Sequence, residues 1–147
     1  MLRGNFPARV DDKGRLKLPT EFRTHLDQSN PAHQFYITSF DGVNARVYPL
    51  REWERIEEKL AALPSMNPIK QKLLSRTNYF GQVVEMDAQG RLLIPAVLRS
   101  AAQMKGDVAV LGYLQYLEVW NEERLTSEMK ANPFTDEDKQ TLSDLGI

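Results

Sequence analysis

An internal repeat constrains the fold of this chain more than any other feature of its sequence. The segment from Val10 to Pro19 aligns with the segment from Met86 to Pro95, and Asp, Gly, Arg, Leu and Pro are identical at matching places. Because a repeat of this kind marks a repeated structural unit, the two halves are expected to fold alike. The match extends downstream to three further pairs of segments: Phe22-Arg23 with Leu98-Arg99, Val47-Tyr48 with Val119-Trp120, and Trp53 with Leu125.

Each repeat is predicted to form two strands, a short helix and two further strands. In the first copy Leu16 and Leu18 alternate with Arg15 and Lys17, as in a strand with one buried and one wet face. In the second copy Leu92-Leu93-Ile94 is apolar throughout, so this strand is expected to be covered on both sides. A second hairpin is predicted in each half, from residues 35–37 with 45–48 and from residues 108–111 with 116–120.

Helices are predicted between and after the repeats. Apolar residues recur every three or four positions from Leu50 to Leu63, which is the pattern of an amphipathic helix. Residues 69–76 are expected to form another short, basic helix. Asn121 can cap a further helix, and Thr135 with Asp138 resembles a capping box for a last turn.

Composition and charge narrow the classes of function. Of the 147 residues, 41% are hydrophobic and 27% are charged, as in an ordinary globular protein. The net charge is -1, but basic residues gather near the N-terminus and acidic ones from Glu122 onward, so the N-terminal region could face phosphate while the tail could not. The absence of cysteine excludes disulfides, a thiolate nucleophile and cysteine-type zinc sites. Residues 1–10 lack the apolar core of a signal peptide, and residues 108–114 are too short to span a bilayer, so a cytosolic protein is expected.

The repeated motif is predicted to be a tight hairpin loop with an oriented arginine. In Asp11-x-x-Gly14-Arg15 the glycine stands where a short loop needs a positive φ, and the aspartate can accept loop N–H groups. The arginine follows at the start of the returning strand, where the carboxylate can hold the guanidinium in one orientation. The second copy, Asp87-x-x-Gly90-Arg91, has the same spacing.

For a single copy, the simpler interpretation is turn chemistry with a surface ion pair. A hairpin needs the aspartate and the glycine, but folding does not require an arginine at the next position twice. A repeated arginine on a wet strand face therefore suggests a repeated ligand, and DNA offers repeated phosphates and base edges.

Several motifs together resemble those of the MraZ family, whose members carry two SpoVT-AbrB domains and regulate the bacterial division and cell-wall gene cluster. The resemblance covers about residues 1 to 125. The matching segments are Arg3-Gly4, Asp11 to Arg15, Tyr48-Pro49-Leu50 with Glu52-Trp53, Ser65-Met66-Asn67-Pro68, Asp87 to Arg91, and Leu117-Glu118-Val119-Trp120.

The resemblance implies a mainly β fold with short helices (α+β). Tandem SpoVT-AbrB repeats with swapped hairpins would form an intrachain pseudo-twofold, double-psi-like barrel. The implied division is a first repeat at residues 1–53, a helical linker at 54–76, a second repeat at 77–125 and an acidic tail at 126–147.

The implied function is sequence-specific DNA binding by an oligomeric ring, which represses the protein's own operon through short, spaced promoter repeats. Arg15 and Arg91 would contact double-stranded DNA, with Lys13, Lys17 and Gln89 as helpers at phosphates or base edges. Asp11, Gly14, Asp87 and Gly90 would shape the loops. A cytoplasmic, nucleoid-associated protein is implied, with no catalytic residue, cofactor, metal, membrane or small-molecule substrate.

Two departures from an ideal repeat are visible. Pro7 stands where the second copy has Val83, so the first strand is expected to be an irregular edge. The second loop has Ala88-Gln89 where the first has Asp12-Lys13, so the two loops are expected to contribute unequally.

The sequence gives less support to two other classes of function. An enzyme has little support, because His25 and His33 lie in a polar region with no matching nucleophile or metal-spaced partner. A protein-interaction module is the more serious alternative, because the same fold forms the dimer core of antitoxins whose acidic tails mask a toxin. Against it stands the doubled arginine motif, which toxin masking does not need.

Overall fold

The computed structural model describes residues 1–147 and contains the predicted repeat of elements. The first repeat comprises β1 (Asn5–Val10), β2 (Arg15–Lys17), α1 (Thr20–Ser29), β3 (Gln34–Thr38) and β4 (Ala45–Pro49). The second comprises β5 (Gln82–Glu85), β6 (Arg91–Leu93), α4 (Ala96–Ala101), β7 (Gly106–Tyr113) and β8 (Tyr116–Asn121). Two helices, α2 (Leu50–Ala61) and α3 (Pro68–Tyr79), join the repeats, and α5 (Glu122–Ala131) and α6 (Asp136–Asp144) end the chain.

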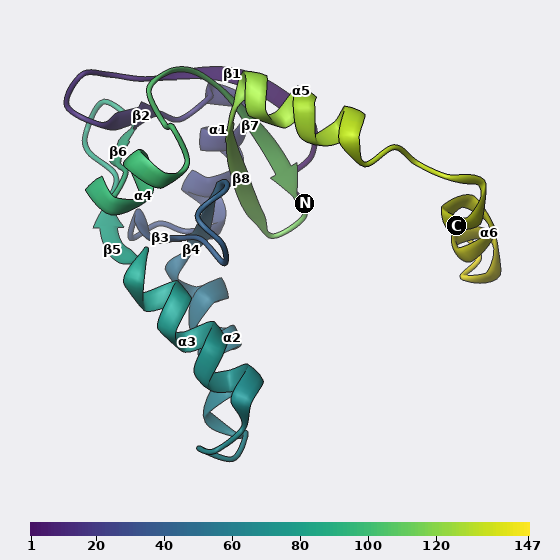
Figure 1. Ribbon diagram of the computed structural model, residues 1–147. Coiled ribbons are helices and arrows are strands. Elements are labelled where there is room, and N and C mark those ends of the chain that lie inside the picture. The colour runs from purple at the N-terminus through teal and green to yellow at the C-terminus, as the bar shows by residue number, and fades with distance from the viewer.

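The two repeats exchange strands in one sheet. Its order is β5-β3-β4-β8-β7-β1-β2-β6, and every neighbouring pair is antiparallel. β1 of the first repeat pairs with β7 of the second, and β5 of the second pairs with β3 of the first. The sheet curls into a nearly closed barrel (Figure 1). The expected mainly β fold, a double-psi-like barrel of two repeats, is therefore confirmed.

A pseudo-twofold axis relates the repeats. Leu16 of β2 pairs with its equivalent Leu92 of β6, and Arg46 of β4 pairs with its equivalent Glu118 of β8. In the strand order these two junctions lie on opposite sides of the barrel. We call the β2–β6 junction with the loops 11–14 and 87–90 the loop end, and the β4–β8 junction the far end.

The barrel interior is filled mainly by aliphatic side chains from both repeats. A single cluster of 20 buried residues includes Leu16, Leu92 and Leu98 at 0% exposure. Because each half contributes strands to the other half's sheet pairing, burying this cluster requires both repeats at once. A smaller aromatic cluster of Tyr36, Tyr48 and Trp53 joins α2 to β3 and β4.

Two expectations about strands need correction. β6 is not covered on both sides, because Leu93 is 49% exposed while Leu92 and Ile94 are fully buried. The strand therefore alternates like β2, and its apolar run does not report two buried faces. β1 is regular rather than irregular: it pairs with β7 along its whole length, and Pro7 lies opposite Ala109. Since β2 pairs with β1 only at Val10, Pro7 has a free edge on its other side, where its missing N–H costs no ladder bond.

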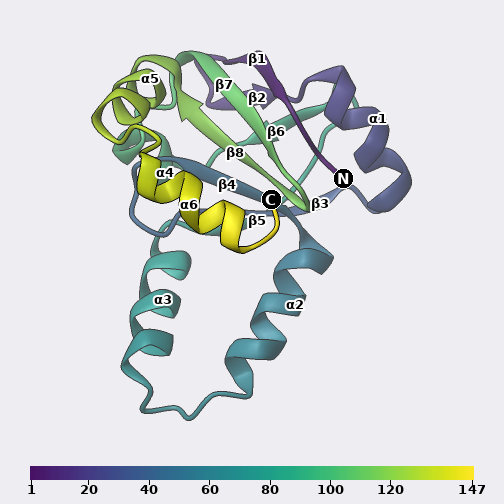
Figure 2. The same ribbon diagram turned by 90° about the vertical axis from the view of Figure 1, so that its right-hand side faces the viewer.

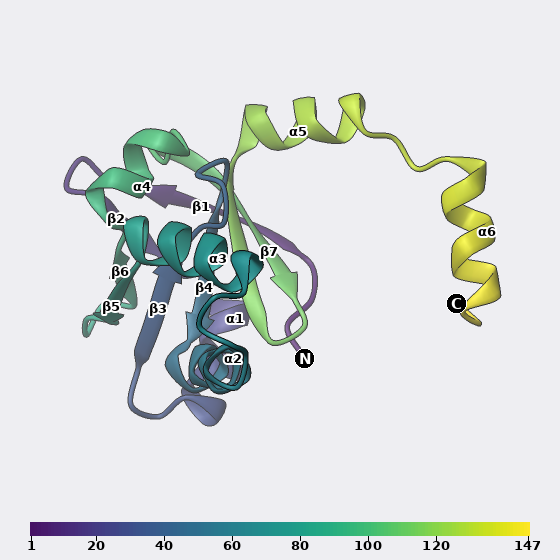
Figure 3. The same cartoon turned by 60° about the horizontal axis from the view of Figure 1, so that its bottom comes forward.

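Two of the helices outside the barrel, α3 and α6, are longer than their sequence signals indicated. α3 begins at Pro68, because the Asn67 side chain accepts hydrogen bonds from the N–H groups of Ile69 and Lys70. The Thr135–Asp138 capping box is present, and α6 continues for nine residues rather than one turn. Figure 2 shows α2 and α3 projecting from the same side of the barrel with a space between them, and Figures 1 and 3 show α6 standing away from it. No helix combines the length and the apolar character needed to cross a membrane.

Candidate nucleic-acid interface

Both loops at the loop end have the predicted hairpin geometry. In the first, the N–H of Asp11 donates to the carbonyl of Arg15 at 3.0 Å, and the N–H of Gly14 donates to the carbonyl of Asp11 at 2.9 Å. The second loop repeats these bonds from Asp87 and Gly90, at 3.0 Å each. Gly14 has φ +85° and Gly90 has φ +76°, so both glycines occupy the left-handed region that the loops require.

Each aspartate holds its arginine with both carboxylate oxygens. Oδ1 of Asp11 accepts from the backbone N–H of Arg15 at 2.9 Å, and Oδ2 accepts from Nε of the same arginine at 2.8 Å. Asp87 and Arg91 make the same two contacts at 2.9 Å each. The backbone N–H bonds are the main reason that the pKa values of both carboxyls lie below the ordinary value, with burial acting in the opposite direction.

This arrangement leaves the binding edge of each guanidinium available. The side chains of Arg15 and Arg91 are 30% and 26% exposed, and only their Nε atoms are used in hydrogen bonds within the chain. Their Nη nitrogens can therefore donate to a ligand while Nε fixes the plane of the group. In the β2–β6 pair, Arg15 lies opposite Leu93 and Lys17 lies opposite Arg91. Both arginines are therefore on the same solvent-facing side of the two strands.

A second pair of arginines completes the loop end. Arg99 of α4 packs on Gly14 of the first loop so closely that a Cβ there would overlap its guanidinium. Its equivalent Arg23 of α1 packs on Gly90, where a Cβ would lie 2.6 Å from Nη1. Each repeat therefore places an arginine against the loop of the other repeat. Nε of Arg99 is buried and has no hydrogen-bond partner in the chain.

Sequence reasoning missed Arg23 and Arg99 as site residues. The signal that could have found them is their place in the repeat, where Phe22-Arg23 aligns with Leu98-Arg99. Phe22 and Leu98 are buried, and the arginine that follows each of them is only half-buried.

The three predicted helper residues take different positions. Lys13 and Gln89 are exposed on the loops, and their backbone N–H groups donate to Asp11 and Asp87. Lys17 instead reaches across the junction, and its Nζ donates to the carbonyl of Gln89 at 2.6 Å. It therefore joins β2 to the opposite loop. Its equivalent in the second repeat is Leu93, so this link occurs once and makes the two loops unequal.

The charge of the loop end favours an anionic ligand. Its four arginines and two lysines face three aspartates, and two of these, Asp11 and Asp87, already serve as internal acceptors. Planar guanidinium groups of this kind bind phosphate oxygens or the acceptor edge of guanine. Although the whole chain has a net charge of -1, the loop end has an excess of positive charge.

Comparisons with known proteins agree with the expected family. A family model described as "MraZ protein, putative antitoxin-like" matches residues 1–76 and 81–145. A protein of Koribacter versatilis named "Transcriptional regulator MraZ" is 60% identical over 147 residues, covering 100% of both chains. Proteins of the same name from Acidobacterium capsulatum and Tolumonas auensis are 55% and 34% identical, over 100% and 99% of this chain and 100% and 91% of their own. These matches confirm the expectation that the protein is not an enzyme. The chain thus belongs to the MraZ family of transcriptional regulators.

Proposed function

We propose that this protein is a sequence-specific DNA-binding regulator whose loop end contacts double-stranded DNA. The observation that carries the proposal is the pair of carboxylate-oriented arginines, Arg15 and Arg91, on one wet face with their Nη nitrogens free. Arg23 and Arg99 add positive charge beside the same loops. Oriented guanidinium groups can read base edges, and the surrounding cations can contact phosphates.

The two arginines are expected to make different contributions. Lys17 bonds to the second loop at Gln89, whereas no lysine reaches the first loop from Leu93. The second loop is therefore held more firmly, while the first carries the additional charge of Lys13. We expect Arg91 to contribute more to sequence recognition and the first loop to contribute more to phosphate contact.

Assembly of several chains into a ring would increase the affinity. Few phosphate contacts per chain release few counterions and give weak binding, whereas linked copies make later contacts intramolecular. We infer the ring from the resemblance to SpoVT-AbrB proteins of this family. The same resemblance suggests that the target is a set of spaced repeats in the promoter of the protein's own operon. Light scattering that finds only monomer would remove this part of the proposal.

The central experiment compares arginine variants on a DNA fragment from upstream of the protein's own gene and on a scrambled fragment of equal length. Arg15→Met and Arg91→Met should each weaken binding by about tenfold or more and reduce the slope of log K against log salt by about 0.9. Arg15→Lys keeps the charge but loses the planar guanidinium group. It should therefore reduce the affinity for the upstream fragment more than the affinity for the scrambled fragment. Arg51→Met, on the exposed surface of α2, is the matched control and should bind normally.

A footprint of the same protein tests the target and its spacing together. Protection of evenly spaced short repeats is the expected result. Undiminished binding by the double variant Arg15→Glu and Arg91→Glu would refute the proposal. Failure of the wild type to bind DNA, together with tight capture of a small protein partner by the acidic tail, would favour the antitoxin-like alternative.

A further inference from the structure

At the far end of the barrel the two repeats carry opposite charges at equivalent positions. At the loop end the contact arginines are the same residue in both repeats, Arg15 and Arg91, although Lys17 corresponds to Leu93. At the far end, Arg46 of β4 faces its equivalent Glu118 of β8, and Tyr48 is the equivalent of Trp120. Because the pseudo-twofold axis relates a positive residue to a negative one, the two halves of the far end are chemically different. A site built around Arg46 therefore occurs only once per chain.

Glu118 is largely satisfied by its own surroundings. It is 4% exposed, and Oε1 accepts hydrogen bonds from Nδ2 of Asn44 and from Nε1 of Trp120, both at 2.9 Å. Its other oxygen lies 3.9 Å from Nε of Arg46, which is a charge contact without a hydrogen bond. Glu118 thus anchors the arginine but does not use its donors.

Arg46 is held in place with most of its donors unused. Its guanidinium carbon lies 3.7 Å from the centroid of the Phe40 ring and 5.4 Å from that of Tyr116. Only Nη1 makes a hydrogen bond within the chain, to the hydroxyl of Tyr48 at 3.1 Å. The side chain is 23% exposed. A fixed guanidinium has five N–H donors, so several remain free for a ligand.

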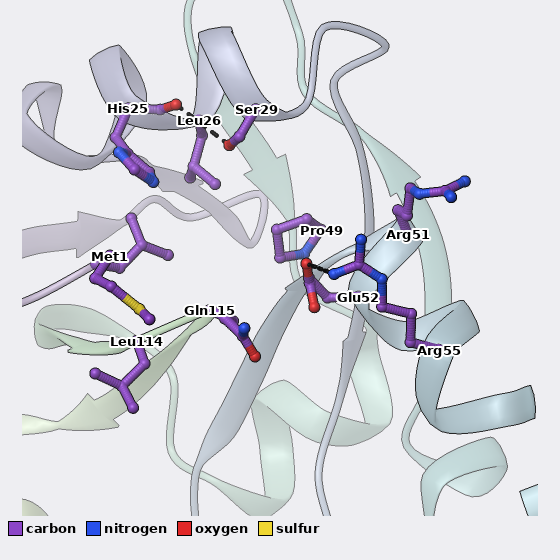
Figure 4. Close-up of a pocket in the computed structure, with 11 residues that line it drawn as sticks. Met1, His25, Leu26, Ser29, Pro49, Arg51, Glu52, Arg55, Leu114 and Gln115 are labelled. Atoms are coloured by element: carbon purple, nitrogen blue, oxygen red, sulfur yellow. Dashed lines mark hydrogen bonds and ion pairs between the residues drawn. The ribbon is translucent and has the colours of Figure 1, made fainter. Parts of the chain in front are cut away.

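These free donors face a cavity of about 460 Å³ between α2 and the β7–β8 turn. Its apolar wall comes from Phe40, Ile56 and Tyr116, and its cations are Arg46, Arg55 and Lys59. Glu52 is the one acidic lining residue, and it already pairs with Arg55 at 2.7 Å. Figure 4 shows this pair from the adjoining cavity of about 180 Å³, beside Gln115 from the β7–β8 turn. The larger cavity therefore has an excess of positive charge next to an aromatic wall.

We propose that this cavity binds a small organic anion, with a phosphate or carboxylate group on Arg46 and Lys59 and a flat apolar part against Phe40 and Tyr116. The cavity volume lies in the range of typical small-molecule sites, whereas an inorganic ion alone would leave most of it empty. A bidentate guanidinium contact gives the anion a fixed orientation. This inference does not depend on DNA binding, since the far end lies opposite the loop end.

The stoichiometry distinguishes this site from the arginine loops. The loop end offers two equivalent arginines per chain, so a phosphate compound bound there would occupy up to two sites. The far end offers one, because the residue equivalent to Arg46 is a glutamate.

The test is isothermal titration of the full-length protein with 1-naphthyl phosphate. Pyrophosphate serves as a probe without a ring, and naphthalenemethanol as a probe without charge. We expect one 1-naphthyl phosphate per chain, bound at least about tenfold more tightly than either comparison compound. Arg46→Met should weaken binding by about tenfold or more, and Lys59→Ala by about threefold.

Control variants separate the loss of a ligand contact from a loss of structure. Arg46→Met leaves the buried Glu118 without its cation, so the double variant Arg46→Met with Glu118→Gln is measured as well. Lys59→Ala changes only an exposed side chain. Arg15→Met with Arg91→Met should leave 1-naphthyl phosphate binding unchanged. Two sites per chain, loss of binding in the loop variants, equal affinity for a comparison compound, or normal binding by the Arg46 variants would each overturn the proposal.

Discussion

Replacing Gly14 by alanine tests whether the loop and the crossing arginine act together. Gly14 has φ +85°, and a Cβ at this position would overlap the guanidinium of Arg99. Gly106 has a similar φ of +71°, but a Cβ there would meet nothing within 4 Å. The two substitutions therefore share the backbone strain and differ in the displaced side chain. Gly106→Ala is the matched control.

The magnitudes follow from these two contributions. An alanine in the left-handed region costs about 1–2 kcal/mol, so both variants should lower the free energy of unfolding by that amount in urea titrations. Only Gly14→Ala moves Arg99. If Arg99 makes a charge-assisted hydrogen bond to DNA, losing it removes about 1.5–3 kcal/mol of binding free energy, which is about 10- to 100-fold in affinity.

The assay measures unfolding and DNA affinity on the same preparations. Gly106→Ala should lose stability and bind DNA normally, whereas Gly14→Ala should lose both. Arg99→Met should weaken binding to the same extent, and adding Gly14→Ala to it should change nothing further, because both act through one side chain. Normal DNA binding by Gly14→Ala, or additive losses in the double variant, would refute the role assigned to Arg99.

Four further outcomes are expected. Leu16→Ala, at a fully buried position, should lower the free energy of unfolding by about 2–5 kcal/mol, whereas Leu93→Ala should change it by about 0.5 kcal/mol; equal losses in urea titrations would contradict the burial of β2 and the exposure of Leu93. Because hydrogen bonds lower the pKa of Asp11 from 3.8, its contribution to stability should persist from neutral pH to about pH 4 and disappear as the pH falls through the lowered pKa; an Arg15 amide shift in NMR that titrates above about pH 5 would argue against these bonds. Burial raises the pKa of Tyr116 to about 12 from 10.0, so stability should be constant below pH 10 and fall between pH 10 and about 12, with a late phenolate absorbance that Tyr116→Phe removes. Deleting residues 136–147 should leave the unfolding midpoint unchanged, since α6 has no buried residue, and a clear drop would show that the helix packs on the barrel.

Much of the fold could be predicted from the sequence because its signals are local. The loops 11–14 and 87–90 follow from an aspartate and a glycine at fixed spacing, and the structure places their hydrogen bonds within five consecutive residues. The alternation of polar and apolar residues from Arg15 to Leu18 predicts one solvent-facing side of the strand, and this signal is also local. The failures at Leu93 and at α6 also have local causes. An apolar side chain can remain exposed on a strand, and a capping box marks where a helix begins but not where it ends.

The sequence by itself determined the repeat, the order of strands and helices, and the orientation of Arg15 and Arg91 by their own aspartates. Only the tertiary structure decided that β1 and β5 exchange between the halves, that Arg23 and Arg99 cross to the opposite loops, and that Arg46 and Glu118 meet on the axis. The physical reason is the range of the interactions. A turn depends on neighbours along the chain, whereas these contacts depend on the pairing register of strands that are far apart in sequence and come together only when the shared core is buried.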